Sequence, residues 1–304
     1  MNNQTPSSDQ FISFQEFFTV LKDNYQKAFL ISAFFVMMST IYSFSLTEQF
    51  TSEVTFKVST KGNEPSQTQG SGLSISSLLS GKGSTTNLGY EIVSIIKSRS
   101  FFNRLLQNNP DILPMLFAAD SFNYSSKSTS FDEGLYNVDT NEWLRDAQPP
   151  FTSIPSNLEL HEVYNKKLNI TIDDDSSLIT ASFTHVSPIF SSALLEEVII
   201  NLNEYIKSKD LQESSEALEY LEKRLQSEPQ TEIRKAISSL VELQLKKNMF
   251  SNLTSSYAVE VIDAPFIPEI KSSPQKSIII FLGLIAGFLV SLLVIFIPRV
   301  SLAK

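Results

Sequence analysis

Cysteine is absent from this 304-residue chain, and histidine occurs only at His161 and His185. Without cysteine there can be no disulfide bond, no thiolate nucleophile and no cysteine-bound metal. Neither histidine belongs to an HExxH sequence, and no nucleophile-elbow motif accompanies them. We therefore expect no catalytic, cofactor-binding or metal-binding residues. A glycosidase whose two carboxylates meet only in the folded chain stays open as an enzyme alternative.

Basic residues are too few to favour a nucleic-acid partner. The net charge is −9, and because residues 1–30 contribute −1 and residues 271–304 contribute +4, −12 remains for residues 31–270. Such an acidic segment repels the phosphates of DNA and RNA. The stretch GSGLSISSLLSGKGS at 70–84 does not match G-x-x-x-x-G-K-[ST], so we expect no phosphate-binding loop.

Two long runs, residues 28–47 and 277–297, lack charged residues. Each has about the 20 residues that a helix needs to cross a bilayer. A buried core helix would carry a polar stripe, which the second run lacks. A signal peptide would not follow 27 mostly polar residues, so the first run is not interpreted as one. Both runs are therefore predicted to be uncleaved transmembrane helices.

Two spans place both chain ends on one side of the membrane. The excess of Lys and Arg near the second span favours the cytoplasm for residues 1–27 and 298–304. Residues 48–276 then form one large domain on the other side. The two cytoplasmic ends are too short to hold a signalling domain, which disfavours a two-span sensor.

Within residues 48–276, alternating and helical apolar patterns predict an α+β domain. The adjacent aspartates at 173–175 are interpreted as a structural turn, because ligands in an EF-type calcium loop lie two residues apart. Residues 61–89 are rich in Gly, Ser, Thr and Gln, so we expect a mobile loop there. No regular element is predicted at 108–157. Strands are expected at 50–58, 168–172, 178–186 and 257–261, and a single helix at 89–107.

A long helical hairpin is predicted next. Ser187 and Pro188 have the character of an N-cap and a first helical residue, and Glu228-Pro229 interrupts the pattern, so helices are expected at about 188–226 and 230–253. The first would be roughly 60 Å long and must pack its apolar stripe along another helix. The stripe consists of Leu195, Val198, Leu202, Leu211, Leu218, Leu221 and Leu225.

A proline-rich stem, residues 264–276, precedes the second span. Pro265, Pro268 and Pro274 fall in a three-residue register, which is the period of a polyproline II helix. We expect a stiff rod about 30 Å long that holds the exterior domain over the membrane. An ordinary proline-rich linker is the alternative.

Small residues recur every four positions inside the second span, at Gly283, Gly287 and Ser291. They lie on one face of the helix, where small side chains permit close approach of another helix. This face and the long helices are expected to join copies of the chain.

The C-terminal stretch resembles the bacterial polysaccharide chain-length determinants, the Wzz-type polysaccharide co-polymerases. Three upstream segments, GYEIVSIIKSRSFF, LITASFTHVSPIFSSALLEEVIINLNEYI and LVELQLKKNMFSNLTSSYAVEVIDAPFIPE, are similar to successive family segments. The chain departs from the family at Gln275, where a lysine often stands, and at Ser176-Ser177, where a glycine is often found. The family signature, P-x2-P-x4-S-P followed by a Gly-x3-Gly span, is here Pro265, Pro268, Ser273, Pro274, Gly283 and Gly287.

The resemblance implies a protein of the bacterial inner membrane with two transmembrane helices. They would flank a periplasmic α+β domain with a small mixed sheet near the membrane and a long helical hairpin. It further implies a non-catalytic homo-oligomer that sets the length of O-antigen, capsule or exopolysaccharide chains. The expected partners are a membrane polysaccharide polymerase, the growing lipid-linked glycan and the lipid bilayer.

Two alternative functions also describe a non-catalytic membrane scaffold, but in a different cellular pathway. One is a component of polysaccharide export, and the other is a membrane activator of a separate cytoplasmic tyrosine kinase. Because the sequence ends at Lys304, we expect no kinase domain of the kind that some relatives carry.

Overall fold

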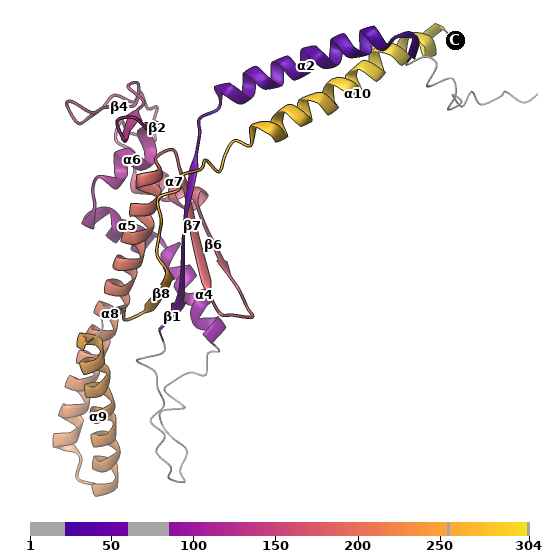
Figure 1. Cartoon of the computed structure of the whole chain (residues 1–304). Helices are drawn as coiled ribbons and strands as arrows, with labels where there is room; N and C mark the ends of the chain where they lie inside the picture. Colours follow the sequence, from indigo (N-terminus) through magenta and orange to yellow (C-terminus); the bar gives the residue numbers. More distant parts are fainter. Residues whose placement is uncertain (1–21, 60–84, 254–255, 303–304) are drawn as a thin grey trace, which may run out of the picture. The chain divides into compact units, whose positions relative to one another are not determined.

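The computed structural model describes residues 22–59, 85–253 and 256–302. They belong to two compact units: Met1–Glu48 with Ser272–Lys304, and Gln49–Lys271. The first unit contains a pair of helices, and the second combines helices with a sheet, so the predicted α+β fold class is confirmed (Figure 1). Most of the N-terminal segment and most of the expected mobile loop at 61–89 lie outside the described residues.

The helix pair consists of α2 (Tyr25–Ser45) and α10 (Lys276–Leu302), which pack side by side. Among the described residues, these two helices are long and apolar enough to cross a membrane. Their large apolar side chains are mostly exposed, as Phe29 is at 70% and Leu282 at 57%, which is unlike the core helix of a soluble domain. Helix α10 continues beyond residue 297, where we expected the second span to end.

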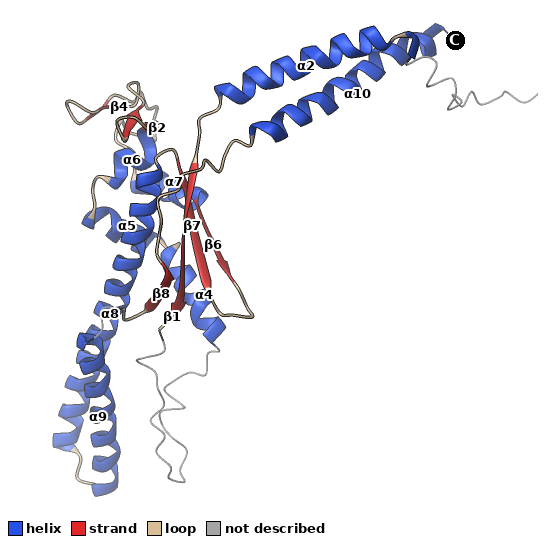
Figure 2. Ribbon diagram, viewed as in Figure 1, coloured by secondary structure: helices blue, strands red, loops and turns tan. Residues whose placement is uncertain are grey.

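An antiparallel sheet forms the centre of the second unit, with the strand order β6-β7-β1-β8 (Figure 2). All three strand pairings are antiparallel, so the expectation of a mixed sheet is wrong. A tight turn joins β6 to β7, so these two neighbouring strands must run in opposite directions. The strands are β1 (Phe50–Val58), β6 (Leu168–Ile172), β7 (Ile179–His185) and β8 (Val259–Asp263).

Alternation along the strands sets the register of the sheet. Every second residue of β7 is buried, and the alternate residues of β1 from Phe50 to Phe56 are buried as well. Two threonine pairs lie opposite each other between these strands. The Oγ1 atoms of Thr51 and Thr184 are 2.8 Å apart, which is hydrogen-bonding distance. A slip of one residue would bring these polar groups into the core.

The aspartate triplet closes the β6–β7 turn. The carboxylate of Asp173 accepts hydrogen bonds from the backbone N–H groups of Asp175 and Ser176 and from the Ser176 hydroxyl. These bonds, led by the one from the hydroxyl, hold the pKa of Asp173 below its usual value. Ser177 has a φ of 56°, a backbone conformation that glycine adopts more readily than residues with a side chain. The triplet therefore forms a structural turn, as interpreted from the sequence.

Helices α4, α5, α7 and the first half of α8 pack around one apolar core with the sheet. The single helix expected at 89–107 is in fact two helices, α4 (Thr85–Ile96) and α5 (Arg99–Asn108). Ser98 explains the break, because its hydroxyl accepts the N–H of Phe101 at 3.2 Å and begins a new helix.

Regular structure also occupies residues 108–157, for which none was predicted. The strands there are two to five residues long, too short to show an alternating pattern. Helix α7 (Asn157–Lys167) follows, and a capping box between Ser156 and Glu159 begins it. The other elements are α6 (Ile112–Ala118), β2 (Ala119–Asn123), β3 (Ser128–Phe131), β4 (Tyr136–Asn137) and β5 (Glu142–Trp143).

The predicted helical hairpin is present as α8 (Pro188–Ser227) and α9 (Thr231–Leu253) (Figure 2). The Ser187 hydroxyl caps α8 by accepting the N–H of Phe190, and Pro188 is the first helical residue. With 40 residues, α8 is about 60 Å long at roughly 1.5 Å per residue.

Candidate functional site

The glycine face of α10 lies directly against α2 of the same chain. A Cβ atom added to Gly287 would stand 2.8 Å from Cβ of Phe35 and 2.9 Å from Cα of Ser32. A Cβ atom added to Gly283 would stand 2.5 Å from Cβ of Ser39. Since non-bonded carbon atoms prefer separations of about 3.5–4.0 Å, an added Cβ atom would overlap the Ser32 backbone at Gly287 and the Ser39 side chain at Gly283.

Buried hydroxyl groups complete the contact between α2 and α10. Ser43 and Ser291 are both fully buried. Ser291 donates its hydroxyl hydrogen to the carbonyl oxygen of Phe288 in its own helix, so it contributes small size rather than a bond to α2. The face with Gly283, Gly287 and Ser291 was expected to join copies of the chain. The first span of the same chain occupies it instead.

Charged and aromatic groups meet beside the start of α10. The ammonium group of Lys276 lies 3.4 Å from the carboxylate of Glu48 and 4.3 Å from the ring centre of Phe44. Because the lysine and glutamate side chains are 26% and 39% exposed, this ion pair contributes at most about 1 kcal/mol. It nevertheless links the residues that follow α2 to the first residue of α10.

The proline-rich stem is not one straight rod. Residues 264–268 belong to no helix or strand, and the backbone bends at residues 269–270. Pro268 is buried, and the Ser52 hydroxyl of β1 donates to the carbonyl oxygen of Phe266 at 2.7 Å. Packing against the sheet therefore holds the start of the stem, rather than polyproline stiffness alone. Further along, Ser273 and Pro274 are half-buried, and the peptide bond between them is cis.

The apolar stripe of α8 has two different partners. Leu195, Val198 and Leu202 are at most 1% exposed and belong to the core around the sheet. The expectation that this part of the stripe packs along another long helix is therefore wrong. The physical reason is that β1 and β7 offer a broad apolar surface to the first half of α8.

The second half of the stripe packs along α9, as the hairpin requires. Its leucines are half-buried, and Ser214 donates to the carbonyl oxygen of Gln244 on α9 at 3.2 Å. Other apolar side chains of the hairpin stay exposed, including Tyr220 at 64%, Leu245 at 48% and Met249 at 63%. The half-buried leucines are Leu211, Leu218, Leu221 and Leu225.

Two basic side chains of the second unit are withdrawn from solvent, His185 fully and Lys167 in part. Burial lowers the pKa of Lys167 to about 8, while its ammonium group donates to the carbonyl oxygen of Leu116. Burial, together with the positive charge of Lys167, lowers the pKa of His185 to about 3. His185 is therefore neutral: its Nδ1 accepts the N–H of Ser187, and its Nε2 donates to the carbonyl oxygen of Met115. These contacts give it a structural role.

The remaining histidine is also held by main-chain atoms. Nε2 of His161 lies 2.9 Å from the carbonyl oxygen of Lys97, with Asn165 beside the ring. Within residues 22–59, 85–253 and 256–302, no three His, Asp or Glu side chains gather closely enough to hold a metal ion.

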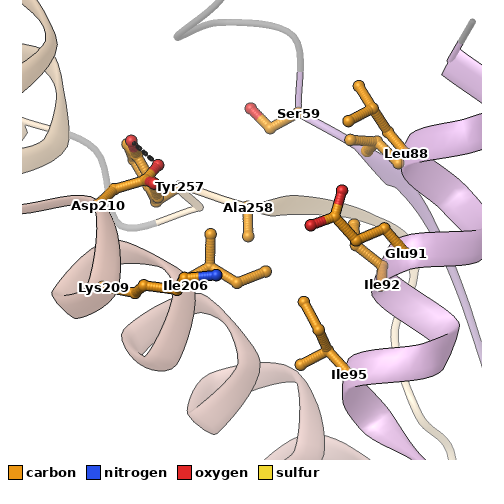
Figure 3. Close-up of a pocket in the computed structure, with 11 residues that line it drawn as sticks. Ser59, Leu88, Glu91, Ile92, Ile95, Ile206, Lys209, Asp210, Tyr257 and Ala258 are labelled. Carbon is orange, nitrogen blue, oxygen red and sulfur yellow. Dashed lines mark hydrogen bonds between the residues drawn. The ribbon is translucent and has the colours of Figure 1, made fainter. Parts of the chain in front are cut away.

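A cavity of about 210 Å³ lies in the second unit between α4, α8 and the ends of two strands (Figure 3). Aliphatic side chains and charged side chains line it together. The sequence gives no sign of this cavity, because its lining comes from four segments far apart in the chain. No periodic pattern connects segments of that kind.

The first third of the chain matches the model of a known protein family. Residues 10–109 match the family model of the Wzz chain length determinant protein. The predicted resemblance to the Wzz family is confirmed. This match covers the sequence from before the first span through β1, α4 and α5. It does not include the proline-rich stem or the second span, which carry the family signature.

The chain was also compared with solved structures and with curated proteins. A solved structure described as a full-length bacterial polysaccharide co-polymerase aligns with 96% of this chain and 98% of its own, at 12% sequence identity and a TM-score of 0.41. Among curated proteins, no sequence matches this chain.

Proposed function

We propose that this protein is a non-catalytic scaffold of the bacterial inner membrane that sets the chain length of a polysaccharide. It would act beside a membrane polymerase, which performs the chemistry on the growing lipid-linked glycan. The observation that carries the proposal is the match of residues 10–109 to the chain length determinant family.

The arrangement of the spans supports the membrane part of the proposal. Two apolar helices at the chain ends are close-packed through Gly283 and Gly287, so they would cross the bilayer as an antiparallel pair. Both chain ends then lie on one side, and the unit of residues 49–271 lies on the other. With cytoplasmic termini, that unit is periplasmic.

Exposed apolar groups support self-association through the hairpin. Leu245 and Met249 lie four residues apart on α9, one helical turn, and Tyr220 on α8 is exposed as well. Copies that pack through these side chains would remove them from water, which favours association. The closed contact between α2 and α10 leaves the hairpin as the better candidate for joining copies.

The bonding of the histidines supports a role without catalysis. Both histidine rings bond to main-chain carbonyl oxygens, and His185 is 1% exposed, so neither is presented to a substrate as a general base. In the proposed division of roles, the polymerase forms every glycosidic bond, and this protein influences only when elongation stops.

The size distribution of the surface polysaccharide tests the proposed function. We expect deletion of the gene to leave polymer on the cell but to change its length distribution on a gel, and the wild-type gene to restore it. Complete loss of surface polymer would instead favour a role in export. A change in phosphotyrosine on a separate kinase, with normal lengths, would favour the kinase-activator alternative.

Charge placed on the hairpin surface tests self-association. Leu245→Asp and Met249→Asp are expected to lower the mass of the detergent-solubilised complex, because they introduce repulsion into an apolar contact. Ser239→Asp on the same helix is the matched control, since Ser239 is exposed and polar. Equal masses for all three variants and the wild type would show that this surface does not join copies of the chain.

A further inference from the structure

The cavity beside α4 is a defined space with two kinds of wall. Ile92 and Ile95 of α4 and Ile206 of α8 form an aliphatic wall. Glu91 of α4 faces Lys209 and Asp210 of α8 across the opening (Figure 3). A ligand in this space would meet apolar surface on one side and charged hydrogen-bonding groups on the other.

Hydrogen bonds fix the polar wall before any ligand arrives. The Tyr257 hydroxyl donates to Oδ2 of Asp210 at 2.6 Å. Oδ1 of Asn203 accepts the N–H groups of Ala258 and Val259 at 2.8 and 3.1 Å. Together they tie the segment before β8 to α8, so Asp210 and Tyr257 are held in place. Such preorganisation lowers the entropy cost of binding.

The volume restricts the size of the ligand. Drug-sized molecules occupy pockets of about 300–1,000 Å³, which is more than this cavity offers. A cavity of about 150 Å³ admits one benzene ring, so about 210 Å³ suits one six-membered ring with substituents.

The lining restricts the chemistry of the ligand. A purely apolar ring would take water from the carboxylates of Glu91 and Asp210 without replacing its hydrogen bonds. Two carboxylates and one ammonium group also disfavour an anion. A sugar ring satisfies both walls, because its C–H face is apolar and its hydroxyl groups donate hydrogen bonds to carboxylates.

We propose that this cavity binds one neutral sugar ring of the glycan. The inference rests on the proposed function, since it names the part of the domain that would contact the polysaccharide. Glu91 and Asp210 accept hydrogen bonds from sugar hydroxyl groups, and the isoleucine wall covers the face of the ring.

Saturation-transfer NMR on the full-length protein in detergent tests the site. The probes are glucose, galactose, mannose and N-acetylglucosamine, with glucuronate as an anionic comparison. We expect saturable binding of at least one neutral sugar, with a dissociation constant in the millimolar range, as befits so small a ligand. Glucuronate should bind at least about tenfold more weakly because of the two carboxylates.

Two variants of α4 distinguish sugar binding in the cavity from sugar binding elsewhere on the protein surface. Ile95→Phe fills the cavity and is expected to abolish the signal. Val93→Phe is the matched control, because Val93 is a half-buried residue of the same helix that packs on the same core but does not line the cavity. Glu91 is exposed, so the Glu91→Ala variant should still fold. It should weaken sugar binding by about tenfold, because about this much affinity is lost with one hydrogen bond to a charged group.

Two results would overturn the assignment. One is no binding of any neutral sugar to the wild type, and the other is equal binding by the Ile95→Phe and Val93→Phe variants. The deletion experiment gives an independent result: altered polysaccharide lengths without sugar binding would refute only the cavity. Unaltered lengths would refute the proposed function, whatever the NMR result.

Discussion

The contact between the two spans leads to a sharp prediction about Gly283. In a Gly283→Ala variant, the new methyl group would lie 2.5 Å from Cβ of Ser39. To restore an ordinary carbon–carbon separation of about 3.5–4.0 Å, the two helices must move apart by about 1–1.5 Å. Overpacking of this kind costs about 1–3 kcal/mol. We therefore expect the helix pair to become wider and less stable.

Ser39 offers a compensating change. The nearest atoms to the added methyl group belong to the Ser39 side chain, and the next is a backbone oxygen at 3.4 Å. Among the described residues, the Ser39 hydroxyl donates to the carbonyl oxygen of Val36, in its own helix. A Ser39→Gly, Gly283→Ala double variant should therefore regain most of the lost stability, with a favourable coupling of about 1–2 kcal/mol.

Spin labels can measure the separation, and the absence of native cysteine makes the labelling simple. Cysteines at Phe34 and Leu289, which are 59% and 55% exposed, would carry the labels. Dilution with unlabelled protein restricts the measured distance to one chain. Ala286→Val on an exposed face of α10 is the matched control. Equal distances in the Gly283→Ala and Ala286→Val variants, or no rescue by Ser39→Gly, would refute the packing argument.

Three further predictions concern the unit of residues 49–271, measured by denaturation of the full-length protein in detergent. Leu195→Ala should cost about 2–5 kcal/mol and Leu218→Ala clearly less, because Leu195 is fully buried while Leu218 is half-buried; equal losses would contradict the division of the stripe. Lys167→Met should raise the free energy of unfolding at pH 7 by about 1–3 kcal/mol, because the folded pKa lies near 8 and the unfolded pKa near 10.5. The wild type should gain this stability between pH 8 and 10.5, whereas a rise of equal size in the Lys167→Met variant would exclude Lys167 as its source. His185 has a folded pKa of about 3 and an unfolded pKa of 6.5, so its contribution should fall by about 2 kcal/mol from pH 6.5 to pH 5. A His185→Gln variant that loses as much over that pH range would contradict this assignment.

Local signals in the sequence were enough to predict the limits of the long helix α8 and the β6–β7 hairpin. Helix α8 was expected at about 188–226 and extends over Pro188–Ser227. Ser187 and Pro188 determine its start, and Glu228-Pro229 determines its end, so both limits depend on neighbouring residues alone. The β6–β7 hairpin was found for the same reason, since Asp173 and Ser176 close the turn by themselves.

The partner of an apolar face could not be read from the sequence. Leu195 and Leu218 occupy the same stripe of one helix, yet the first packs on the sheet and the second lies in the helical hairpin. Periodicity shows which side chains share a face but does not show what covers that face. The same holds for Gly287, whose pattern predicts a close helix contact but does not show that the contact is with the same chain.

Short elements were missed for two different reasons. The strands between residues 119 and 143 are too short for any alternating pattern, so their pairing depends on tertiary contacts. Helix α7, in contrast, had a readable signal. Glu159 follows Ser156 by three residues, which is the spacing of a capping box, and this spacing predicts the start of a helix there.

Reconstitution with purified components tests the central claim most directly. A membrane polymerase and its lipid-linked repeat units would be placed in vesicles with or without this protein, and the products sized on a gel. We predict polymer in both samples, with lengths gathered around a preferred value only when the protein is present. The protein alone should neither extend nor cleave glycan. Identical length distributions in the two samples, or glycan chemistry by the protein alone, would contradict the account.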